Sequence, residues 1–162
     1  MRSFLVYCYV LLFGFGLNCQ TNCETAFVGD TLTFPSDGKV YNGKYVETTL
    51  KNFSVVRLFI ADNNRLFLKM IVTKNFYFDK VATLEIRSGH KSYYAKDTKQ
   101  YKITKTSGLF VIEVFKNYVA TIREEGITSI VFGEAETDFT RQDAKQIKQI
   151  AKCVYEAISG KK

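Results

Sequence analysis

The sequence predicts an α+β domain: a mostly antiparallel sheet of roughly six to eight strands, with a short helix at about 115–125 and a long C-terminal helix at about 141–159 packed on one face. Apolar and polar residues alternate through much of the first two thirds of the chain, which is typical of strands. Two later segments change to the helical period. Pro35 is the single proline, and no repeat or linker divides the chain. The alternative fold is an all-β sandwich with a terminal helix.

The chain begins with a segment typical of an export signal. Arg2 is followed by an apolar run, Phe4–Leu17, that contains no charge and ends in polar residues. The run is shorter than the ~20 apolar residues that span a bilayer. We therefore predict a signal peptide over 1–19, a single globular domain over 20–162, a secreted or periplasmic location, and no transmembrane segment after signal removal. The alternatives to cleavage after Cys19 are a lipid anchor on that residue and a retained membrane anchor.

The strand predictions follow the period-two pattern and the turns between strands. Phe53–Ile60 and Arg65–Thr73 predict a hairpin, because Asp62, Asn63 and Asn64 between them have turn composition. The other predicted strands are Asp30–Phe34, Lys39–Leu50, Val81–Arg87, Ser92–Ala95, Gln100–Thr104, Leu109–Val114 and Ile127–Phe132.

The first helical segment is short. Phe115, Val119 and Ile122 recur at i, i+4 and i+7, and Gly126 stands where a helix would stop. With a strand on either side, this segment predicts a compact β-α-β passage. Its crossover is expected to be right-handed if the two strands are parallel in one sheet.

The last segment has the stronger helical pattern. Thr140 and Asp143 resemble a capping box with Asp in the usual Glu position. The apolar stripe consists of Ala144, Ile147, Ile150, Ala151, Val154 and Ile158. The residues that face away from it are Lys145, Lys148, Gln149, Lys152 and Glu156. We expect the stripe to cover the sheet.

Two of the four cysteines, Cys23 and Cys153, remain after the predicted signal is removed. In an oxidising compartment they predict a disulfide that closes a loop of about 130 residues. Cys153 lies on the flank of the apolar stripe, which suits a bridge to an N-terminal arm that crosses the helix. The alternative is two unrelated thiols. No Cys or His pair has metal-ligand spacing and no nucleotide-binding motif occurs, so we predict neither a metal nor a cofactor.

A lysine- and tyrosine-rich segment is the candidate binding surface. Between His90 and Lys105 it has a single acid, Asp97. Its candidate ligand-binding residues are Lys91, Tyr93, Tyr94, Lys96, Lys99, Tyr101 and Lys102. This combination suits an anionic glycan or a lipid headgroup, whereas export removes the protein from nucleic acid. The alternative is a solvated edge hairpin whose lysines discourage aggregation. We call residues 90–105 the Lys/Tyr segment.

Three further features have structural interpretations beside functional ones. His90, the only histidine, is expected in a surface turn, since no nucleophile elbow accompanies it. Acids that surround the start of the last helix complement its dipole, rather than forming a calcium or glycosidase site. They are Glu134, Glu136, Asp138 and Asp143. Asn52 begins an N-glycosylation acceptor sequence, should the host be eukaryotic.

These patterns favour an exported, non-enzymatic binding or interaction domain of the cell envelope or extracellular space. One alternative is a small hydrolase with a site assembled from scattered residues, His90 and a carboxylate among them. Another is a structural or interaction protein that uses an open sheet edge.

Overall fold

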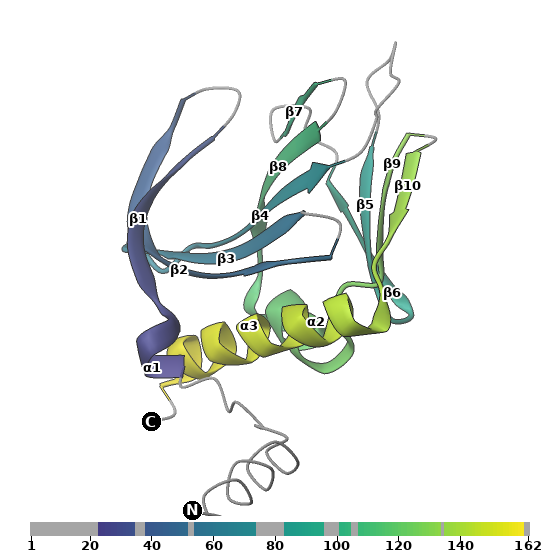
Figure 1. Cartoon of the computed structure of the whole chain (residues 1–162). Coiled ribbons are helices and arrows are strands. Elements are labelled where there is room, and N and C mark those ends of the chain that lie inside the picture. Colours follow the sequence, from purple (N-terminus) through teal and green to yellow (C-terminus); the bar gives the residue numbers. More distant parts are fainter. Residues whose placement is uncertain are drawn as a thin grey trace, which may run out of the picture.

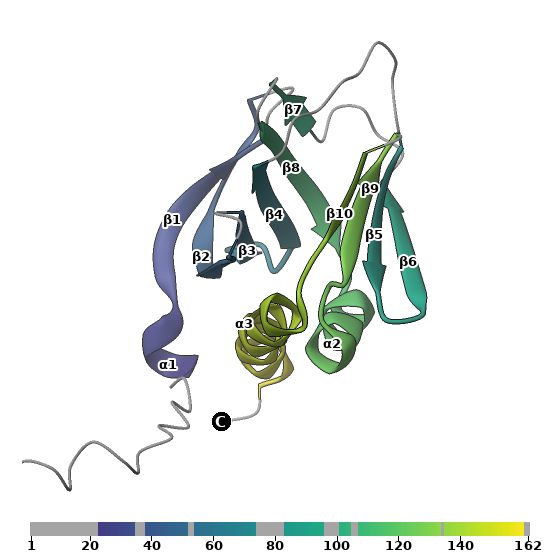
Figure 2. The same ribbon diagram turned by 45° about the vertical axis from the view of Figure 1, so that its right-hand side comes forward.

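The protein contains two antiparallel sheets with helices along one side (Figure 1, Figure 2). The structure is a computed structural model that describes residues 23–34, 38–51, 54–73, 83–95, 101–104, 107–133 and 135–160. The predicted signal peptide, Asn52, Lys96 and Lys99 lie outside the described residues. Within these residues the predicted α+β class is confirmed. None of the described helices is both long and apolar enough to cross a membrane.

The strands are divided between a larger and a smaller sheet. The larger sheet has the order β1-β2-β3-β4-β8-β7 and the smaller β10-β9-β5-β6. The strands of the larger sheet are β1 (Val28–Thr33), β2 (Val40–Thr49), β3 (Val55–Ala61), β4 (Leu66–Thr73), β7 (Tyr101–Ile103) and β8 (Ser107–Val114). Those of the smaller sheet are β5 (Leu84–Ser88), β6 (Lys91–Ala95), β9 (Ser129–Phe132) and β10 (Ala135–Asp138). The helices are α1 (Cys23–Ala26), α2 (Lys116–Glu125) and α3 (Arg141–Ser159).

The hairpin predicted from the alternating pattern is confirmed as β3 and β4. Leu58 pairs with Leu68 in its antiparallel register. Asn64 adopts a φ of 61°, and its N–H donates to the Ala61 carbonyl at 2.8 Å. The turn therefore uses the tolerance of Asn for left-handed backbone.

The predicted single sheet and the β-α-β passage differ from the structure. β8 belongs to the larger sheet and β9 to the smaller one, so α2 connects two sheets and makes no parallel crossover. β10 was not predicted. Its weak pattern explains this, because Glu136 and Asp138 face outward while only Ala135 and Thr137 alternate with them.

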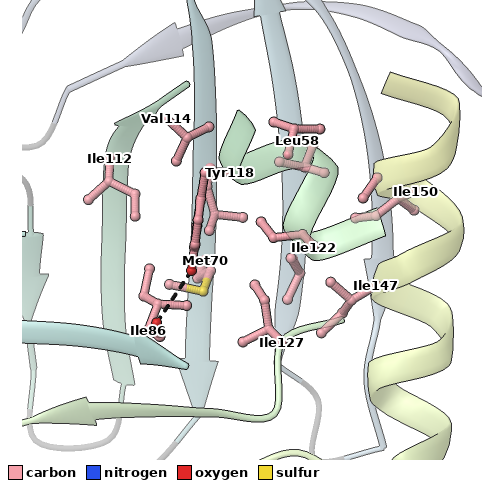
Figure 3. Packing of buried hydrophobic residues seen from close by; sticks show 14 of the residues in the cluster. Leu58, Met70, Ile86, Ile112, Val114, Tyr118, Ile122, Ile127, Ile147 and Ile150 are labelled. Atoms are coloured by element: carbon pink, nitrogen blue, oxygen red, sulfur yellow. Dashed lines mark hydrogen bonds between the residues drawn. The ribbon is translucent and has the colours of Figure 1, made fainter. Parts of the chain in front are cut away.

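The main core lies between the two sheets and the inner sides of α2 and α3. Met70 and Ile112 of the larger sheet, and Ile86 of the smaller one, are each 0% exposed within it. Tyr118 of α2 reaches into the same cluster, and its hydroxyl donates to the Ile86 carbonyl at 3.3 Å (Figure 3). Ile147 of α3 is also 0% exposed, so the predicted stripe does cover the sheets.

The opposite face of the larger sheet curls around a second, smaller cluster. Phe34, which follows β1, and Phe67 of β4 have ring centroids 5.4 Å apart. Two strands separate β1 from β4 in the sheet, so the sheet must bend strongly to bring these rings together. Gly43 permits the bend, since a Cβ there would collide with the Ile60 carbonyl oxygen.

The pair α2 and α3 closes the core. The helices run antiparallel, because Lys116 at the start of α2 reaches the Ile158 carbonyl near the end of α3. Gly126 ends α2 as predicted, with a φ of 73°. Phe115, predicted on the apolar side of this helix, is instead 67% exposed. It is the N-cap and has extended backbone, which turns its side chain out of the helical period.

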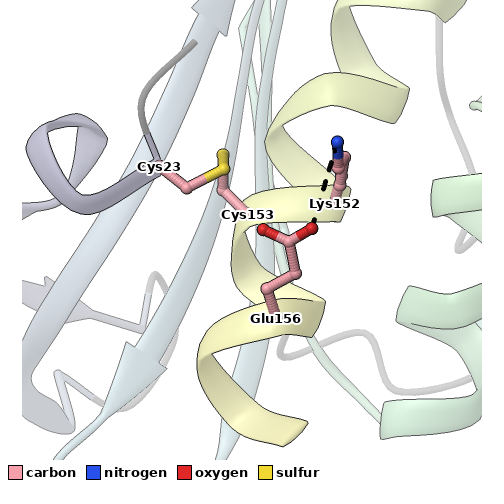
Figure 4. Close-up of a disulfide and its surroundings, with 4 residues drawn as sticks. All are labelled: Cys23, Lys152, Cys153 and Glu156. Carbon is pink, nitrogen blue, oxygen red and sulfur yellow. Dashed lines mark ion pairs between the residues drawn. A yellow bond between two sulfur atoms is a disulfide. The ribbon is translucent and has the colours of Figure 1, made fainter. Parts of the chain in front are cut away.

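A sulfur–sulfur bond joins the start of the described chain to α3. The Sγ atoms of Cys23 and Cys153 lie at disulfide distance, 2.11 Å, as the sequence predicted (Figure 4). The residues are 130 positions apart, and Cys153 is only 1% exposed. The bond fixes α1 beside the last turns of α3.

Replacement of Gly126 and of Gly160, which both have a positive φ, tests how closely α2 must approach α3. A Cβ on Gly126 would lie 2.7 Å from the Ala144 carbonyl oxygen, whereas one on Gly160, at a φ of 64°, meets no atom within 4 Å. We expect Gly160→Ala to cost about 1 kcal/mol through backbone strain alone. Gly126→Ala should cost at least about 2 kcal/mol, because it adds a clash. Urea unfolding measures both, and equal losses would contradict tight packing at Gly126.

Candidate functional site

The Lys/Tyr segment is divided between the two sheets. β6 is the edge strand of the smaller sheet and pairs with β5, whereas β7 is the edge strand of the larger sheet and pairs with β8. The two strands do not form the hairpin considered as the alternative interpretation. Lys91, Tyr93 and Tyr94 therefore lie on one sheet, and Tyr101 and Lys102 on the other.

The two tyrosines of β6 point in opposite directions. Tyr93 faces the core, where its ring lies 4.8 Å from that of Tyr118 and its hydroxyl donates to the Glu113 carbonyl at 2.8 Å. Burial raises the pKa of Tyr93. Tyr94 is 55% exposed on the outer face. Only Tyr94 of this pair is available to a ligand in solution.

A carboxylate occupies the middle of that outer face. Glu85 accepts hydrogen bonds from Arg87 Nε at 2.9 Å, Ser92 Oγ at 2.7 Å and Tyr94 Oη at 3.3 Å. These bonds, with that from Arg87 the strongest, lower the pKa of Glu85 to about 2. Ser92 and Tyr94 of the Lys/Tyr segment thus bond an ionised carboxylate on β5, which weakens the attraction of β6 for anions.

Two arginines of the larger sheet form ion pairs with carboxylates of neighbouring strands. Arg57 bonds Asp30 at 3.1 Å and Glu47 at 2.7 Å. Arg65 forms a two-pronged pair with Glu113 and lowers the pKa of that carboxyl group. Each guanidinium therefore serves to cross-link strands.

A different basic surface lies between α2 and α3. It is a groove of about 950 Å³ that also takes in Thr128 and the Phe139–Thr140 connection. We call it the helix groove. Its charged lining residues are Arg123, Arg141, Lys145, Lys148, Lys152, Glu125 and Glu156. Five cations thus face two acids.

The cations form a stripe along α3. Arg141, Lys145, Lys148 and Lys152 occur at i, i+4, i+7 and i+11, so all four lie on one helical face over about 16 Å. Within the described chain, the first three make no ion pair. Lys152 makes only a long one, with Glu156 at 4.0 Å.

The second wall and the floor of the groove are more fixed. Arg123 of α2 pairs with Glu124 at 2.6 Å, and its guanidinium carbon lies 4.1 Å from the centroid of the Tyr155 ring. Phe139, 8% exposed, contributes apolar surface to the lining. The groove therefore combines mobile lysine charges with a positioned arginine and an apolar base.

Sequence reasoning assigned these lysines to a solvated helix face and missed the groove. The spacing of the four cations is visible in the sequence, and it marks one surface of the helix. The second wall is not visible, because it depends on how α2 packs beside α3. Periodicity alone does not supply that contact.

The other residues considered from the sequence are His90 and the acids near the start of α3. His90 is exposed in a two-residue turn that follows β5, where Gly89 has a φ of 58°. Its neighbour Ser88 is buried and donates to the Gly126 carbonyl. Among the acids, Glu136 pairs with Arg87. In the part of the chain that the structure describes, no group of three His, Cys, Asp or Glu residues could hold a metal ion.

Asp143 completes the predicted capping box. Its N–H donates to Thr140 Oγ1 at 3.2 Å, and its Oδ2 accepts the Thr140 N–H at 2.9 Å. Its Oδ1 accepts the Lys51 N–H at 3.1 Å, which ties the start of α3 to the end of β2. Burial favours the neutral acid, but the bonds from Thr140 and Lys51 outweigh it and hold the pKa of Asp143 below its usual value.

Comparisons of this chain with protein-family models, with curated proteins and with solved structures find no match.

Replacement of Asp143 tests the structural role of the acidic cluster. We expect Asp143→Ala to lower the free energy of unfolding by about 1–2 kcal/mol at neutral pH. A carboxyl group with a depressed folded pKa stabilises above its unfolded pKa and loses that effect as the pH falls through the folded value. The deficit should therefore shrink as the pH falls below the ordinary pKa of aspartate, about 3.9. Asp138→Ala, on the exposed face of β10, is the matched control and should change little. A pH-independent deficit would contradict this account.

Proposed function

We propose that the protein is an exported, non-enzymatic binding domain that holds an anionic component of the cell envelope or extracellular space in the helix groove. One observation carries the proposal. Arg141, Lys145 and Lys148 lie in register on one face of α3 and have no acidic partner among the described residues. Two arginines on the larger sheet, Arg57 and Arg65, are instead held in ion pairs with acids of neighbouring strands.

The arrangement suits an extended anion more than a single small one. Lysine ammonium groups are flexible point charges with three donors each, so they accept carboxylate, sulfate or phosphate without demanding one geometry. Four cations along about 16 Å of helix can contact several such groups at once. Binding of this kind weakens as salt screens the charges.

The helix groove is preferred over the Lys/Tyr segment for an electrostatic reason. Glu85 holds its negative charge among Arg87, Ser92 and Tyr94, so an anion that approaches β6 meets repulsion as well as attraction. Among the described residues that line the helix groove, the acids are Glu125 of α2 and Glu156 of α3. Lys96 and Lys99 lie outside the described residues, so the experiment below replaces them in a variant of their own.

The proposal of export is supported by the apolar leader and by the position of the cysteines. The Sγ atoms of Cys23 and Cys153 lie at bonding distance, and such bonds persist in oxidising compartments. A secreted or periplasmic protein would meet this condition.

The intact mass of the native protein tests export. We expect a chain that begins at Gln20 and lacks two hydrogens, from cleavage after Cys19 and oxidation of Cys23 and Cys153. A mass increased by acyl chains on Cys19 would instead identify a lipoprotein. The full-length chain with Met1, recovered reduced from the cytoplasm, would contradict export.

Retention on an immobilised sulfated polysaccharide tests the binding surface. We expect the processed protein to be retained at low salt. The triple variant Lys145→Glu, Lys148→Glu and Lys152→Glu should elute early, because the stripe loses its positive charge.

The matched control carries Lys96→Glu, Lys99→Glu and Lys102→Glu, which changes the net charge by the same amount. It should keep most of the retention. The reverse order of elution would assign binding to the Lys/Tyr segment. Failure of the unaltered protein to bind would remove the proposed function.

A further inference from the structure

We infer that the helix groove is the membrane-facing side of the protein and that its ligand is a bilayer surface with anionic headgroups. This inference rests on the proposed function and specifies its partner. Three observations support it: the attachment point of the chain start, the position of the helices in the fold, and the array of cations on α3.

The chain start is fixed to the same helix that displays the cations. Cys23 is bonded to Cys153, which adjoins Lys152 in α3 (Figure 4). Five residues separate Leu17, the end of the apolar run, from Cys23, and this stretch spans at most about 22 Å. The processed chain that begins at Gln20 has only three residues before Cys23, so its N-terminus is held near α3.

The helices occupy one side of the fold. In both views α1, α2 and α3 lie beneath the two sheets (Figure 1, Figure 2). The inner side of α3 is buried against the core through Ile147, Ala151 and Val154. Lys145 and Lys148 lie on a different side of α3 from these buried residues, and both line the helix groove. The side that receives the chain start is thus also the side with unpaired cations.

The cation array matches the charge of an anionic bilayer. Each Lys or Arg near such a surface increases partitioning by about fivefold. The four cations of the stripe then give several hundredfold, which is a weak interaction for a free protein. An interaction of this strength can be measured by partitioning to vesicles and is weakened by salt.

Vesicle sedimentation with the processed, oxidised protein tests the inference. We expect partitioning to phosphatidylcholine vesicles that contain about one third phosphatidylglycerol, little to pure phosphatidylcholine, and release by salt. The double variant Lys145→Gln and Lys148→Gln should lower the partition coefficient about 25-fold, since two fivefold contributions are lost. Gln retains helix propensity, so α3 should persist.

The matched control is Lys39→Gln with Lys102→Gln. Lys39 directly precedes β2 and Lys102 lies in β7, at the ends of these strands away from the helices (Figure 1). It removes the same charge and should lower partitioning less than about threefold. Thermal unfolding verifies that both variants are folded. Equal losses in the two variants would overturn the assignment of this face.

A second result separates the two proposals. Retention on the polysaccharide without partitioning to anionic vesicles would overturn the membrane inference and leave the proposed function standing. Absence of both interactions would overturn both.

Discussion

The whole fold depends on burial of two sheet faces that share no strand. Among the described residues no backbone ladder connects the larger sheet to the smaller one, so apolar contact between them must supply what hydrogen bonding does not. Met70 and Ile86, one from each sheet, lie in the same closed cluster. Sheets that diverge leave an open side, and α2 with α3 fills it. The hydroxyl of Tyr118, which α2 places inside this core, donates to the Ile86 carbonyl, and this bond avoids the cost of a buried hydroxyl without a partner.

The helix groove, which we propose as the binding surface, follows from this closure. Because Ile147 and Val154 of α3 must face the core, the helix can present charges only on its remaining surface. Packing of α2 alongside then converts a convex helix face into a groove with a second wall. The contact at Gly126 is as close as the backbone allows, which sets the width of the groove at one end. Core packing and the proposed binding surface therefore use opposite sides of the same helix pair.

Local features of this fold could be predicted from sequence, and contacts between distant segments could not. Three features depend on only a few adjacent residues and can therefore be predicted from the local sequence. They are the turn at Asn64, the end of α2 at Gly126 and the capping box of Thr140. The division into two sheets depends on which strands pair across long separations, and alternation is the same in either arrangement. Phe115 shows a related limit: its spacing fits the helix, but as N-cap it does not share the helical backbone. The same limit applies to the candidate site, since the Lys/Tyr segment is continuous in sequence while its strands β6 and β7 lie at the edges of different sheets.

The bond between Cys23 and Cys153 links the fold to its environment. α1 has only four residues, too few to be stable as an isolated helix, and its contacts with the core are limited to partly buried Cys23, Ala26 and Phe27. A cross-link over 130 positions lowers the chain entropy of the unfolded state, which stabilises the folded state by roughly 4–5 kcal/mol on loop-length arguments. This is more than those few contacts could contribute. In the reduced protein the sheets and α3 would keep their core, while the chain start would lose its fixed place beside α3. Oxidation is therefore what puts the start of the chain and the cationic stripe on one side of the molecule.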